Sequence, residues 1–154
     1  MIKITLISVG ALKNKALQSL AADYLKRIKP YARLELIETP AASFGKGDQE
    51  KAKKLEKKGL EKVLHRFEDN SVYLLAEQGK LYNSSKWADF MDSYDGSDLV
   101  FVVAGALGWD KDLLAKYQSL SLSALTFPHE LARVILLEQI YRGLSINMKK
   151  AYHY

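Results

Sequence analysis

Hydrophobic and polar residues alternate in two short stretches near the start of the 154-residue chain. Residues 2–9 and 33–38 both show this period of two, which predicts two strands. Between them, apolar side chains recur at helical spacing as far as Ile28, so a helix is expected to begin after Asn14 and to end before Pro30. The order strand, helix, strand is typical of a parallel sheet with crossover helices.

Two further strands are predicted from apolar runs that do not alternate. Residues 71–76 and 99–103 are almost entirely apolar, as expected for strands covered on both faces. Residues 77–80 are expected to turn the chain after the first of these runs. Ser84 or Ser85 is then expected to cap a helix.

A lysine-rich helix is predicted between the two pairs of strands. Residues 41–47 have the composition of a loop, and Asp48 is expected to cap the helix that follows. Its apolar stripe consists of Ala52, Leu55, Leu60, Val63, Leu64 and Phe67. The other faces carry Lys51, Lys53, Lys54, Lys57, Lys58, Lys62 and Arg66, partly neutralised by Glu50, Glu56 and Glu61. This surface is either simply solvated or contacts an RNA backbone.

Two helices are predicted in the last third of the chain, a short one from Asp110 and a long one over 131–144. A segment of small side chains over 120–127 lies between them. The long helix is apolar on nearly every side, which suits a buried position or contact with a second subunit. Its exceptions, Glu138 and Arg142, are four residues apart and can form an ion pair that is either structural or part of a site.

These elements predict an α/β fold: a mostly parallel sheet with helices on both faces, in a single domain over residues 1–154. The start of the chain lacks the features of a signal peptide, and no apolar stretch is long enough for a membrane span, so a cytoplasmic protein is expected. The absence of cysteine excludes disulfides, thiolate metal sites and cysteine nucleophiles. A net charge of +5 favours a polyanionic partner.

In parallel sheets, ligands bind at the carboxyl ends of the strands, which here are residues 75–79, 104–108 and 121–127. Gly105 and Gly108 permit close approach of a ligand to the backbone, but they complete neither a dinucleotide-binding nor a P-loop motif. A plain tight turn explains them equally well. His129 lies near the start of the next helix, where an ordinary strand-to-helix connection is the more economical interpretation.

The final residues, Tyr152, His153 and Tyr154, combine a group that titrates near neutral pH with rings that can stack on a base. Aromatic residues at a chain end indicate that this end is held in a site or an interface.

Four segments together closely resemble the RlmH family, and the match covers the whole chain. They are residues 101–108, residues 122–129, the 133–142 helix with Glu138-Gln139-Ile140-Tyr141-Arg142, and the final Tyr152-His153. The resemblance implies a small SPOUT-class methyltransferase with a C-terminal trefoil knot. It also implies a homodimer that uses S-adenosylmethionine to methylate N3 of a pseudouridine in 23S ribosomal RNA, as free RNA or in the assembled ribosome, without a metal.

By this resemblance, the cofactor is expected at Leu75, Ala104, Gly105, Gly108, Leu122, Ser123, Ala124, Leu125, Thr126 and Phe127. Glu138, Arg142, Tyr152 and His153 are expected to be catalytic. Enlarging Gly105 to Val is expected to exclude the cofactor while leaving the fold intact. The family commonly has Gly-Gly at Ala104-Gly105 and a basic residue at Tyr154, and these departures leave a noncatalytic RNA-binding or ribosome-associated module as the alternative.

Overall fold

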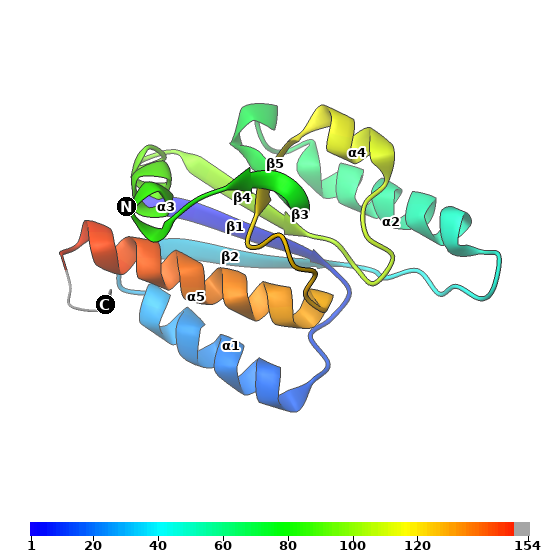
Figure 1. Ribbon diagram of the computed structural model, residues 1–154, viewed down its shortest axis with the longest axis horizontal. Coiled ribbons are helices and arrows are strands. Elements are labelled where there is room, and N and C mark those ends of the chain that lie inside the picture. Colours follow the sequence, from blue (N-terminus) through cyan, green and yellow to red (C-terminus); the bar gives the residue numbers. More distant parts are fainter. Residues whose placement is uncertain (150–154) are drawn as a thin grey trace.

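Five parallel strands form the sheet around which the chain folds (Figure 1). The computed structural model describes residues 1–149. The strands are β1 (Ile2–Val9), β2 (Ala32–Thr39), β3 (Val72–Leu81), β4 (Asp98–Val103) and β5 (Gln118–Ser121), and their spatial order is β2-β1-β4-β3-β5. The mostly parallel α/β sheet predicted from the sequence is therefore confirmed.

Helices cover both faces of this sheet, as predicted. The elements are α1 (Lys15–Ile28), α2 (Gln49–Leu64), α3 (Ser84–Asp92), α4 (Lys111–Lys116), α5 (His129–Asn147) and a 3₁₀ turn, η1 (Asp69–Ser71). Helices α1, α3 and α5 share one hydrophobic core with the sheet, and α2 and α4 share the other. Buried aliphatic side chains of β1 and β4 alternate between these two cores.

The cap residues expected from the sequence located three helix starts correctly and placed a fourth slightly too late in the chain. The side chains of Asn14 and Asp110 each accept a hydrogen bond from the first turn of their helix, as expected. Asp48 occupies the cap position of α2 without such a bond. The side chain of Asn83, and not of Ser84 or Ser85, accepts the bond from the Lys86 amide of α3 at 2.9 Å.

The turn predicted at residues 77–80 is wrong, because β3 continues to Leu81. Its pairing with β5 is irregular there: both Leu75 and Lys80 lie opposite Leu120. A Cβ on Gly79 would come within 2.6 Å of the Leu120 backbone. Gly79 thus permits two backbones to approach closely, and β5 pairs with residues too polar to predict a strand by themselves.

The apolar stripe predicted for α2 is wrong at one position. Ala52, Leu60 and Leu64 are buried as expected, but the Leu55 side chain is 54% exposed. Glu56 is buried in its place, at 6% exposed. Positions four residues apart along α2 share a face, so a buried row through 52, 60 and 64 includes residue 56.

Within residues 1–149, no helix is long and apolar enough to cross a membrane. Over the same range, no cluster of three or more potential metal-ligating side chains occurs. The trefoil knot implied by the resemblance stays a prediction.

Candidate functional site

A cavity of about 720 Å³ opens at the carboxyl ends of β3 and β4 and along the segment after β5. Nine of the ten residues expected to bind the cofactor line it. They are Leu75, Ala104, Gly105, Gly108, Leu122, Ser123, Leu125, Thr126 and Phe127. Ala124 is exposed and is not among the lining residues. The three strand-end segments identified from the sequence therefore border a single cavity.

Trp109 is a lining residue that the sequence reasoning missed. Its indole N–H donates a hydrogen bond to the Leu75 carbonyl oxygen at 2.6 Å, which ties the loop after β4 to β3. Gly108, immediately before it, has a φ of +73°, a conformation that favours glycine. A tryptophan that directly follows a loop glycine was the available signal for this contact.

Short-range hydrogen bonds shape the segment after β5. The Ser121 hydroxyl donates to the Ser123 carbonyl at 2.8 Å, and the Ser123 hydroxyl accepts from the Leu125 amide at 3.0 Å. These bonds turn the chain along the cavity and leave the Leu125 side chain 72% exposed. The small hydroxyl residues of this segment thus define its backbone path.

The start of α5 is fixed by two charged side chains. The Glu130 carboxylate accepts hydrogen bonds from the Lys13 and Asn14 amides, and these bonds lower the pKa of Glu130. The buried Arg133 side chain pairs with Glu38 at 3.1 Å and donates to the Gly10 carbonyl at 3.3 Å. Together these contacts hold His129 and Ala132, which form the α5 wall of the cavity.

The Glu56 carboxylate lies behind the cavity, between α2 and the loop after β4. It accepts a hydrogen bond from the Ala42 amide at 3.2 Å. Burial raises the pKa of Glu56, and the Ala42 hydrogen bond and the nearby His129 oppose this shift. Glu56 therefore holds the loop before α2 by a hydrogen bond and lies beside the loop after β4.

The backbone of Gly105 lines the cavity, but a side chain added at this position would point toward β1 and α2 and not into the cavity. A Cβ on Gly105 would lie 3.1 Å from Val9 Cγ1 and 3.6 Å from Glu56 Oε1. The valine side chain of Gly105→Val would therefore press on the packed layer between β1 and α2, so this substitution does not test the cofactor site alone.

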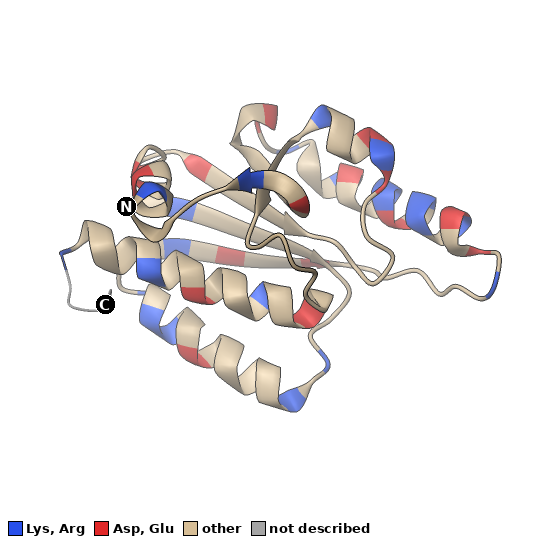
Figure 2. Cartoon of the chain, viewed as in Figure 1, with Lys and Arg blue, Asp and Glu red and all other residues tan. Residues whose placement is uncertain are grey.

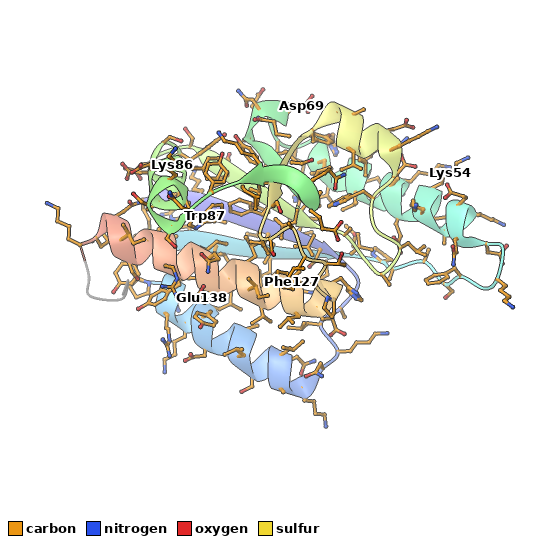
Figure 3. All side chains as sticks on the ribbon, in the orientation of Figure 1. Lys54, Asp69, Lys86, Trp87, Phe127 and Glu138 are labelled. Carbon is orange, nitrogen blue, oxygen red and sulfur yellow. The ribbon has the colours of Figure 1, made fainter. Side chains whose placement is uncertain are left out.

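The predicted Glu138–Arg142 ion pair is present in α5, with a shortest distance of 2.6 Å between Arg142 Nη2 and Glu138 Oε1. Arg142 Nε also donates to the same oxygen at 3.1 Å, and both side chains are largely shielded from solvent. Figure 3 shows Phe127 near the start of α5 and Glu138 farther along the helix. The pair does not line the cavity of its own chain. Tyr152, His153 and Tyr154 lie outside the described residues.

A parallel α/β domain with a cavity at its strand ends belongs to the broad class that binds a small organic ligand or cofactor at this edge of the sheet. The comparison with protein families makes this specific. The chain belongs to the SPOUT methyltransferases: the family described as "Predicted SPOUT methyltransferase" matches residues 2–153.

Individual relatives confirm the resemblance to the RlmH family. The ribosomal RNA large subunit methyltransferase H of Bacillus cytotoxicus is 39% identical over 157 residues, covering 97% of this chain and 98% of the relative. The protein of the same name from Bacillus thuringiensis is 38% identical with the same coverage. The similarity therefore extends over almost the whole of both chains.

Proposed function

We propose that this methyltransferase transfers a methyl group from S-adenosylmethionine to N3 of a pseudouridine in ribosomal RNA of the large subunit. It acts as a homodimer of single-domain chains in the cytoplasm. The observation that carries the proposal is the convergence on one cavity of nine residues that the resemblance assigns to the cofactor. The large-subunit rRNA methyltransferases similar to the chain over nearly its full length supply the substrate class.

The cavity has the size and chemistry that S-adenosylmethionine requires. Its volume lies within the range of about 300–1,000 Å³ typical of small-ligand sites. Leu75, Leu122 and Phe127 provide apolar walls for the adenine ring, and the neighbouring backbone supplies hydrogen-bonding groups for its edge. Gly108 leaves room for a ligand against the loop after β4.

The reaction requires positioning and removal of one proton. When bound, S-adenosylmethionine supplies an electrophilic methyl group on sulfur. The N3–H proton leaves the base as the new N–C bond forms and the sulfur–carbon bond breaks. No protein thiol is needed for this displacement, in agreement with a chain that has no cysteine.

In this proposal, the side chains that act on the target nucleotide come from the second subunit. Glu138 and Arg142 are separated from their own cavity, since the α5 residues that line it are His129 and Ala132. From Ala132 to Glu138 the helix rises about 9 Å. In this arrangement His153 assists removal of the N3 proton, and Tyr152 stacks on or orients the pseudouridine base. The Glu138–Arg142 pair positions the same nucleotide through its base or its phosphate.

Thr126→Trp tests the cofactor site, because residue 126 lines the cavity and is exposed, so the larger ring fills the cavity without entering the core. Calorimetric titration is expected to show S-adenosylmethionine affinity falling by more than about tenfold, or 1.4 kcal/mol. Ala124→Trp is the matched control, two residues away and outside the cavity, and should bind normally. Equal affinity of the two variants would place the cofactor elsewhere. An inability of the parent protein to bind S-adenosylmethionine would favour the noncatalytic RNA-binding module.

His153→Ala tests the catalytic assignment. Methyl transfer to ribosomes that contain unmethylated pseudouridine is expected to fall by about 10²–10⁴-fold, the usual contribution of general acid–base catalysis. Cofactor affinity should stay within a few-fold of the parent, because the described cavity is built from residues 75–132. Full activity of the variant would exclude the role given to His153.

A further inference from the structure

Four lysines lie along one face of α2 and form a continuous row. Lys51, Lys54, Lys58 and Lys62 are spaced by three or four residues, and all four are exposed. At about 100° per residue they occupy an arc of about 80°, and from first to last they extend over about 16 Å of helix. We call these four residues the lysine stripe. Figure 2 shows the charged residues along α2.

The acidic residues of α2 do not neutralise the lysine stripe. Glu50 pairs with Lys53 at 3.6 Å, and Glu61 pairs with Lys57 at 3.5 Å. Lys57 also reaches Asp112 of α4 at 3.3 Å. Within residues 1–149, by contrast, none of the four stripe lysines forms an ion pair. The positive charge of α2 is therefore compensated on one flank and uncompensated on the outer face.

The opposite face of α2 anchors the helix firmly. Ala52, Glu56, Leu60 and Leu64 are all buried, and they point away from the lysine stripe. The stripe is thus presented on a helix of fixed position, so only the side chains themselves need ordering when a ligand binds. Leu55, with 54% of its side chain exposed, lies beside Lys51 and Lys58 and adds an apolar contact surface to the row.

Helix α2 is also adjacent to the candidate site. Residues of α2 pack against Ala104, Gly108 and Trp109, which line the cavity from the other side. The lysine stripe lies on the outer face of this helix, so an extended polyanion bound there is separated from the loop that borders the cavity by the width of α2, about 10 Å. Regularly spaced phosphates on one strand match a row of lysines, which act as point charges without a demand for base sequence.

We propose that the lysine stripe binds the phosphate backbone of the ribosomal RNA substrate and holds the RNA beside the cavity. This inference rests on the proposed function for its choice of an RNA over other polyanions. It assigns the stripe a role in docking and none in the chemical step. Its variants should consequently change the KM for RNA and leave kcat at saturating RNA unchanged.

The test compares two proteins with the same loss of four charges. In the first, the four stripe lysines are changed to Gln, which preserves helix propensity. In the matched control, four exposed lysines on other elements are changed to Gln: Lys80, Lys86, Lys111 and Lys116. RNA binding is measured by fluorescence anisotropy with a large-subunit rRNA fragment from 50 to 300 mM salt. Methyl transfer and calorimetric titration with S-adenosylmethionine are measured in parallel.

Loss of the stripe is expected to weaken RNA binding by more than about tenfold at 100 mM salt and to reduce the slope of log affinity against log salt by about 3. The control should remain within a few-fold of the parent. An equal loss in both proteins would show a general effect of net charge and overturn the inference, as would normal RNA binding by the stripe variant. If the parent protein binds RNA but does not methylate it, the proposed function fails while the binding comparison still decides the role of the stripe.

Discussion

Two carboxylates near the cavity, Glu56 and Glu130, have pKa values shifted in opposite directions from their ordinary value. Glu56 is buried among α2 and the loop after β4, and burial raises its pKa. Glu130 accepts two backbone hydrogen bonds, and these lower its pKa. Relative to the unfolded chain, folding shifts Glu56 toward its protonated form and Glu130 toward its ionised form, so the two contribute opposite pH dependences to the free energy of unfolding.

Glu56→Gln is expected to raise the free energy of unfolding at pH 7, because Gln keeps an acceptor for the Ala42 amide and removes a buried charge. The destabilisation by Glu56 is absent below its ordinary value of 4.5 and grows as the pH rises through its raised pKa in the folded state. The advantage of Gln should therefore shrink as the pH is lowered. Denaturant unfolding between pH 4 and 8 measures it, and an advantage independent of pH would contradict the assignment.

Glu130→Gln serves as the control of opposite sign. The stability that Glu130 contributes is present above its ordinary value of 4.5 and is lost as the pH falls through its lowered pKa. The variant should be less stable than the parent at pH 7, and the difference should close in acid. If the stability difference between variant and parent changed with pH in the same way for both variants, the pKa shifts assigned to Glu56 and Glu130 would be contradicted.

Among elements, the contact between β3 and β5 depends on one glycine. Gly79→Ala is expected to destabilise the protein by about 1–3 kcal/mol, because the added Cβ would lie 2.6 Å from the Leu120 backbone and force the strands apart. Gly45→Ala is the matched control: its Cβ meets nothing closer than Asp48 Oδ2 at 3.9 Å. Denaturant unfolding should separate the two variants clearly. If the two variants unfolded at similar denaturant concentrations, β3 and β5 could separate without loss of stability.

Elements marked by nearby residues, such as a helix cap or an apolar run, could be predicted from the sequence. Elements whose extent depends on pairing with a segment far away in the chain could not. Asn14 caps its own helix, and the apolar runs of β3 and β4 need no particular neighbour to be recognised as buried strands. The extension of β3 through Gly79 arises only because β5 lies beside it. In the site, the strand-end rule and the resemblance indicated nine lining residues, whereas Trp109 was missed because its hydrogen bond joins the loop after β4 to a residue of β3 that lies 34 positions earlier.

At the scale of the whole molecule, the proposed shared site predicts a homodimer. Size-exclusion chromatography with light scattering is expected to give about twice the chain mass of 17.4 kDa. Mixing Thr126→Trp with His153→Ala gives a sharper result. In a mixed dimer, the intact cavity of one subunit meets the intact C-terminal residues of the other, so random pairing should restore about a quarter of the sites. An active monomer, or a mixture that remains inactive after subunit exchange, would contradict the shared site.

The contacts between α5 and the start of the chain have a consequence for how the protein is made. Glu130 binds the amide of Lys13 across 117 residues of sequence, and Arg133 reaches Gly10 and Glu38. At about 5–20 residues per second, translation leaves an interval of about 6–23 s between the synthesis of Lys13 and that of Glu130. During that time the apolar side of β1 lacks the cover that α5 will supply, which exposes the nascent chain to aggregation and to chaperones. The wall of the cavity that α5 supplies is thus the last of its walls to be synthesised, on a ribosome, the particle whose RNA we propose the protein modifies.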